Sequence, residues 1–146
     1  GCNDGYIRYF KDSAKSDDSG TTDTAIDPYV TLASFPVGDG FDNEGKIKQI
    51  VLESSGGASS GDFSDTDGFS YEVHVADDAE TCIENVRDAA TANLSGSITG
   101  TGRKSRIRQN VRGQYATIKI YNSTISQTFG INRILVEKDI VGRLKR

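Results

Sequence analysis

The sequence predicts an all-β protein, an antiparallel β-sandwich of jelly-roll-like type with one short helix. Apolar and polar residues alternate in several segments, which is typical of strands that bury one face. About seven or eight such segments follow one another, separated by stretches rich in Gly, Ser and Asp. One segment alone has helical periodicity, so sheets must supply most of the core.

The first strands are expected at residues 5–10, 29–37 and 46–53. A polar loop at 15–23 separates the first two, because it is rich in turn-forming residues. Pro36 places the end of the second strand at a sheet edge or at an exit from it. In the third strand, both the odd and the even positions carry apolar residues, which indicates a buried strand with a bulge.

A Ser/Gly/Asp-rich surface loop at 54–68 precedes a half-buried strand at 69–76. The helix is expected next, because Ala79, Cys82, Ile83 and Val86 have helical spacing. Asp77 or Asp78 is available as its N-cap, and the helix should lie over an open end of the sheet.

A weaker strand at 94–99 leads to a basic segment at 103–112 and an apolar one at 115–121. Both alternate, and a Gly-containing turn separates them, so the pattern predicts a β-hairpin. In the first segment Arg106, Arg108, Asn110 and Arg112 share one face, opposite Ile107 and Val111. The last strand is expected at 129–138.

The net charge of −4 is unevenly distributed. Residues 91–146 carry 11 basic and 2 acidic side chains, whereas residues 1–90 carry 6 basic and 19 acidic ones. Such asymmetry is compatible with a nucleic-acid surface. Pairing of early with late strands, with opposite charges facing each other, is favoured, because no aromatic residues interleave the arginines.

Composition and motifs point to no catalytic centre, so we expect a protein that is not an enzyme. Cys2 and Cys82 read as free thiols, and no apolar run is long enough for a membrane span. Gly57-Ala58-Ser59-Ser60-Gly61 matches a nucleophile elbow, but no helix follows it. Gly102-Arg103-Lys104-Ser105 misses the phosphate-loop register by one residue.

Two further site candidates have simpler structural interpretations. His74, with Glu72 on its face of the strand, is interpreted as an exposed strand histidine. Asp62, Asp65 and Asp67 could form a loose calcium site, although the EF-hand spacing fails and a solvated turn is the default. No other cofactor is expected.

The face formed by Arg106, Arg108 and Arg112 is the candidate partner-binding surface. It could bind a neighbouring protein or phosphates, or it could be an ordinary solvated sheet face without a partner.

Several segments resemble the region of bacteriophage head–tail and tail-associated virion proteins in which a C-terminal β-sandwich follows a propeller-like β-repeat. The resemblance lies in residues 4–10, 15–18, 25–27, 29–32, 46–53, 71–88, 106–118 and 129–138. It implies that residues 1–26 are the end of the preceding repeat region or a flexible linker, and that residues 27–146 form the sandwich. The loops at 19–24 and 54–68 are longer than the family pattern.

The resemblance implies a non-enzymatic structural protein of the virion, assembled in the host cytoplasm and bound to other virion proteins, and an oligomer is compatible with that role. Contacts would use sheet edges, loops and the basic face. The alternative is a carbohydrate-binding β-sandwich for host-surface attachment, with Tyr6, Tyr9, Phe41 and Tyr121 available for stacking on a host glycan. No membrane is expected as a partner, and protein is favoured over nucleic acid.

Overall fold

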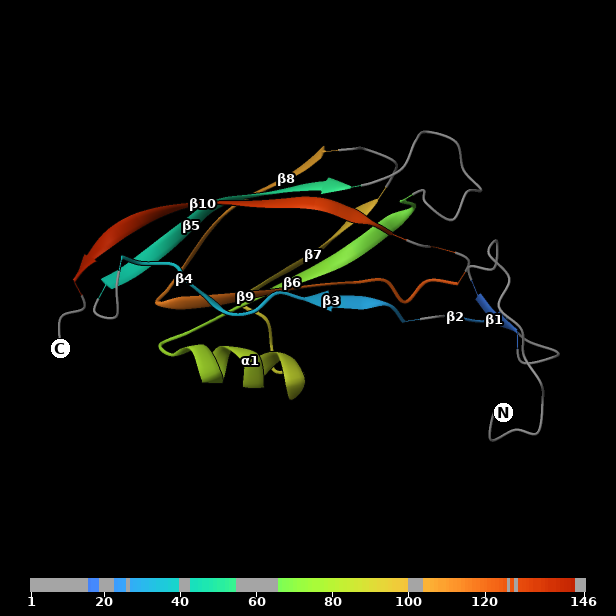
Figure 1. Cartoon of the computed structure of the whole chain (residues 1–146), viewed down its shortest axis with the longest axis horizontal. Helices are drawn as coiled ribbons and strands as arrows, with labels where there is room; N and C mark the ends of the chain where they lie inside the picture. Colours follow the sequence, from blue (N-terminus) through green and yellow to red (C-terminus); the bar gives the residue numbers. More distant parts are fainter. Residues whose placement is uncertain are drawn as a thin grey trace.

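Two antiparallel sheets face each other in the computed structural model, which describes residues 16–18, 23–25, 27–39, 43–54, 66–99, 104–125, 127 and 129–143 (Figure 1). The five-stranded sheet contains β3 (Tyr29–Thr31), β4 (Phe35–Pro36), β6 (Gly68–Ala76), β7 (Leu94–Thr99) and β9 (Tyr115–Tyr121). The three-stranded sheet contains β5 (Asn43–Ser54), β8 (Lys104–Gly113) and β10 (Ile131–Arg143). The predicted all-β sandwich is confirmed.

The core lies between the sheets and is built by alternation along the strands. In β9, Ala116, Ile118 and Ile120 are buried against the other sheet, whereas Thr117, Lys119 and Tyr121 lie on the opposite face. Ile47, Ile50 and Leu52 of β5 supply the facing side of the core. Ile47 and Ile50 can both point inward because the register of β5 shifts between residues 47 and 49 against both neighbours, which confirms the predicted bulge.

The predicted hairpin at 103–121 is wrong. β8 pairs with β5 in one sheet, and β9 pairs with β3, β4 and β6 in the other, so the turn at Gly113-Gln114 carries the chain between sheets. Both strands point their apolar residues into the same core. The same residues would also face the core if β8 and β9 were paired in one sheet, so their alternation does not distinguish the two arrangements. Gly113 is required at this corner, because a Cβ atom there would lie 2.8 Å from the Cβ of Val75.

Two other segments differ from expectation. The strand predicted at 29–37 is divided into β3 and β4, which both pair with β9 but with registers that differ by one residue. Pro36 ends it at a sheet edge, as predicted. Within the expected loop at 15–23, β1 (Ser16–Asp18) pairs with β2 (Asp23–Ala25) as a separate two-stranded ribbon. The strand expected at 5–10 lies outside the described residues.

Helix α1 (Ala79–Arg87) begins at the predicted cap, since the Asp78 carboxylate accepts a hydrogen bond of 2.7 Å from the backbone N–H of Thr81. This bond and a second one from the Thr81 hydroxyl hold the pKa of Asp78 below its usual value. The helix does not cover an open end. It lies on the face of the five-stranded sheet turned away from the other sheet, where β6 ends and β9 begins (Figure 1).

Candidate functional site

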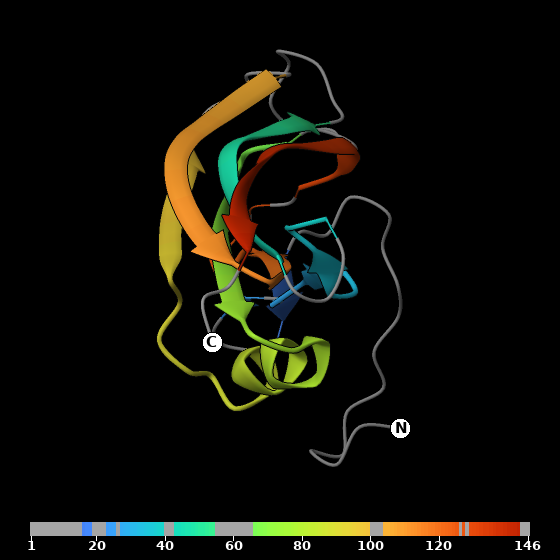
Figure 2. The same cartoon turned by 90° about the vertical axis from the view of Figure 1, so that its left-hand side faces the viewer.

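Arg106, Arg108 and Arg112 are exposed on β8, on the side facing away from the core. We call these three arginines the basic face. Ile107 and Val111 on the same strand are buried in the core, so the predicted division of faces is confirmed. Because β8 is an edge strand, the basic face is bordered by β5 on one side only. Figure 2 shows β8 and β10 on opposite sides of β5.

The charges next to the basic face do not neutralise it. Its register partners on β5 are Val51, Gln49 and Lys46, none of which is acidic. Two acidic residues of this sheet pair across β5 and β10 instead: Glu53 lies 3.1 Å from Arg133, and Asp139 pairs with Lys48. Within the described part of the chain, the three arginines therefore form no ion pair, and their charge is available to a partner.

Charge pairing between early and late strands is real elsewhere. Besides the two pairs between β5 and β10, Glu72 of β6 lies 3.6 Å from Lys119 of β9. The hydrogen bond and charge of Asp139 raise the pKa of Lys48. Thus β9 and β10 form ion pairs with neighbouring strands, whereas the arginines of β8 form none among the described residues.

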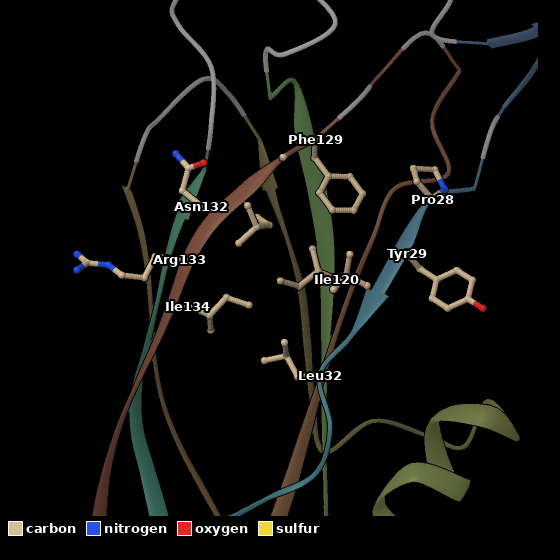
Figure 3. A pocket seen from close by; sticks show the side chains of 11 residues that line it. Pro28, Tyr29, Leu32, Ile120, Phe129, Asn132, Arg133 and Ile134 are labelled. Carbon is tan, nitrogen blue, oxygen red and sulfur yellow. The ribbon is translucent and has the colours of Figure 1, made fainter. Parts of the chain in front are cut away.

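An apolar pocket of about 570 Å³ opens at the other edge of the sandwich, between β3 and the start of β10. Leu32, Ile120, Phe129 and Ile134 are among the side chains that line it (Figure 3). Both β3 and β10 are edge strands, so the pocket lies where the two sheets are not joined. The sequence did not predict this pocket, because its lining comes from β3 and from the start of β10, which lie far apart in the chain.

The expectation of an exposed His74 is wrong. The side chain is 1% exposed, because α1 folds over this part of the sheet. Its Nε2 lies 3.6 Å from the Glu72 carboxylate, and neither ring nitrogen has a hydrogen-bond partner within the described residues. Alternation correctly placed His74 outside the core, but it could not predict which part of that face the helix would cover.

Cys82 is the buried residue of α1 and a free thiol, whereas Cys2 lies outside the described residues. The Cys82 thiol donates hydrogen bonds to the backbone carbonyls of His74 and Tyr115, at 3.2 and 3.5 Å. Burial raises the pKa of the thiol, which is the opposite of the depressed pKa of a reactive cysteine. The contact of Cys82 with His74 therefore holds the helix on the sheet and does not form a nucleophile–base pair.

The loop candidates fall mostly outside the described residues. These are Asp62 and Asp65 of the calcium hypothesis, the Gly57–Gly61 segment, and Gly102 and Arg103. Lys104 and Ser105 are described and begin β8. Asp67 is described and directly precedes β6. No group of three or more His, Cys, Asp or Glu side chains suited to a metal ion occurs among the residues with described positions.

Two tyrosines lie side by side on the outer face of the five-stranded sheet. Tyr29 of β3 is the register partner of Tyr121 of β9, and its ring is 68% exposed and points away from the pocket (Figure 3). The Lys119 ammonium lies 5.0 Å from the centre of the Tyr121 ring. Tyr29 was not among the aromatic candidates from the sequence, and Tyr6, Tyr9 and Phe41 lie outside the described residues.

Neither the protein-family models nor the curated proteins that were compared with this chain match it. In the portion of the chain with described structure, no helix has the length and apolar character needed to cross a bilayer.

Proposed function

We propose that this chain is a non-enzymatic structural protein of a bacteriophage virion, associated with the head–tail junction or the tail. In this proposal the sandwich binds neighbouring subunits through its sheet edges, its loops and the basic face. The observation that carries the proposal is the charge of Arg106, Arg108 and Arg112 on an edge strand, which no described acidic side chain neutralises. The sandwich fold agrees with the fold that the resemblance implies.

The partner surface should be acidic and should belong to a protein. Three arginines on one strand present planar, multidentate donors, which suit carboxylates as well as phosphates. The aromatic side chains that would stack nucleic-acid bases are missing from β8, whose remaining exposed residues are polar. A partner strand added to β8 would also satisfy the free backbone groups of that edge.

Immunogold electron microscopy of virions from the biological source of the sequence tests the assignment, with an antibody against the sandwich. Label at the neck or tail supports it, and protein that remains in the lysate while virions carry no label contradicts it. The contribution of the basic face is tested by replacing Arg106, Arg108 and Arg112 with Glu. The variant should fold and lose incorporation into virions, whereas the neutral Gln109→Asn variant on the same strand should keep it.

A carbohydrate-binding module is the second candidate, favoured by the exposed Tyr29 beside the half-buried Tyr121. Sugar rings stack on exposed aromatic faces, and Ser70, Glu72 and Lys119 beside Tyr121 offer hydrogen-bonding groups. Glycan-array binding that disappears in Tyr29→Ala would support this function. Binding that persists unchanged in that variant would remove this surface as the glycan site.

A further inference from the structure

Strand β10 is a long edge strand of the three-stranded sheet. It spans 13 residues and pairs with β5 on one side, while its other edge has no partner strand in the described part of the chain. Leu135, Ile140 and Val141 are 45%, 59% and 42% exposed. Long edge strands with exposed apolar residues are templates for pairing with another chain, and proteins usually guard them with charge or short length.

Residues 133–137 read Arg-Ile-Leu-Val-Glu, and this order is complementary to itself when two copies run antiparallel. With Leu135 opposite Leu135 of a second copy, Arg133 lies opposite Glu137, and Ile134 lies opposite Val136. Each of these pairs occurs twice because the arrangement is twofold symmetric. We infer that the chain forms a homodimer by antiparallel pairing of β10 with β10 of a second copy, centred on Leu135.

The surroundings of β10 match this register on the outer face of the sheet. Leu135 is the register partner of Val51, so the two leucines at the centre would join two valines into one apolar strip across the dimer. Arg133 already contacts Glu53, and Glu137 of the second copy would add a carboxylate on its other side. Acidic and basic groups would then alternate across the interface.

Neighbouring registers are less favourable. Centring the pair on Val136 places Leu135 opposite Glu137 and Ile134 opposite Lys138. Centring it on Glu137 places two carboxylates face to face. The register centred on Leu135 places Arg133 opposite Glu137 on the outer face and Ile134 opposite Val136 on the inner face. The sequence of β10 therefore favours this register.

The inner side of the same edge is the apolar pocket. Ile134 lines that pocket and, with Val136, packs against the core from β10. A strand added at this edge would carry its own Ile134 and Val136 on the same inner side, next to Val30 of β3 and Leu32, which follows that strand. The second copy would thereby cover apolar surface that one copy leaves open.

The dimer is independent of the virion proposal, because it rests on β10 and not on the basic face. Sedimentation velocity of the full chain across a concentration series tests it. The wild type should show a reversible monomer–dimer equilibrium. Arg133→Glu and Glu137→Arg should each raise the dimer dissociation constant roughly tenfold or more, because each places like charges opposite one another at two symmetric positions.

The decisive sample is an equimolar mixture of these two variants. One copy then carries two acidic side chains at positions 133 and 137, and the other carries two basic ones, so the mixture should associate although neither variant does alone. Arg106→Glu on β8 is the matched control, with the same charge change on the opposite edge, and it should leave the equilibrium unchanged. A monomeric wild type, a mixture that stays monomeric, or an equal effect of Arg106→Glu overturns the inference.

Discussion

Strands β8 and β10 are the two edges of the same three-stranded sheet, and they present opposite chemistry. β8 buries Ile107 and Val111 and exposes arginines, whereas β10 exposes the apolar residues Leu135, Ile140 and Val141 among charged residues of both signs. Arg133 and Asp139 of β10 are paired to β5, and the basic face has no acidic partner in the described structure. The difference separates a basic edge suited to an acidic neighbour from an edge of apolar residues and mixed charges suited to a second copy.

The comparison also shows how one sheet can avoid unspecific growth. Like charges on β8 oppose pairing of β8 with itself, because antiparallel copies would bring arginines together. The same charges leave β8 open to a partner of opposite sign. β10 lacks this protection, and its order of residues restricts pairing to one register.

The largest expected effect is on the free energy of unfolding, and it compares a buried residue of β8 with an exposed residue of β10. Ile107→Ala on β8 removes core contacts of a side chain that is almost fully buried, and should lower the free energy of unfolding by about 2–5 kcal/mol. Ile140→Ala on β10, outside the self-complementary segment, should change it by less than about 0.5 kcal/mol. Urea denaturation measures both. Equal losses would mean that β10 contributes to a core in the same way as β8.

The next effect concerns the centre of the proposed dimer. Leu135→Lys places two ammonium groups opposite each other and removes the apolar strip with Val51, so the dimer dissociation constant should rise roughly tenfold or more. Gln109→Lys adds the same charge to the exposed side of β8 and serves as the control. Sedimentation velocity gives both constants, and equal shifts would show that net charge, not the β10 edge, governs association.

A smaller effect should follow from removing the charge that guards β8. Replacing Arg106 and Arg108 with Leu gives β8 an apolar exposed row like that of β10. A second association site should appear, and light scattering should detect species larger than the wild-type assembly. If the double variant keeps the wild-type mass at every concentration, the arginines do not act as a guard.

The smallest effect is electrostatic. The pKa of Lys48 is raised in the folded protein by the Asp139 hydrogen bond, so its stabilising contribution is present in full below pH 10.5 and is lost as the pH rises through the folded-state pKa. The stability difference between wild type and Lys48→Gln should therefore shrink in that alkaline range. Arg108→Gln on β8 should show no such pH dependence, because it removes no ion pair and arginine does not titrate there. A difference that persists at high pH would contradict this pairing.

Much of the fold could be predicted from local patterns. Alternation identified which residues of β6, β8 and β9 face the core, and spacing with an acidic cap located α1. These features depend on neighbours along the chain, which the sequence displays directly. The basic face was found for the same reason, since it lies on one strand.

Which strands pair, and which part of a sheet the helix covers, depend on residues far apart in the chain. The predictions of the hairpin and of an exposed His74 were wrong for this reason. The sequence predicted that β8 and β9 form a hairpin, because the pattern of apolar residues in a strand does not show which strand it pairs with. In either sheet, β8 and β9 would bury the same apolar residues. His74 is buried by a helix that starts only a few residues later but folds back over the sheet. The pocket joins β3 to β10, so no local pattern of either strand could reveal it.

Hydrogen–deuterium exchange of the full chain at increasing protein concentration tests most directly whether the two edges differ. Backbone amides in residues 131–141 should become more protected as concentration rises, because a second β10 supplies their missing hydrogen-bond partners. Amides in residues 104–113 should exchange at the same rate throughout. Exchange in β10 that is independent of concentration, or equal protection gained by β8, would contradict the account.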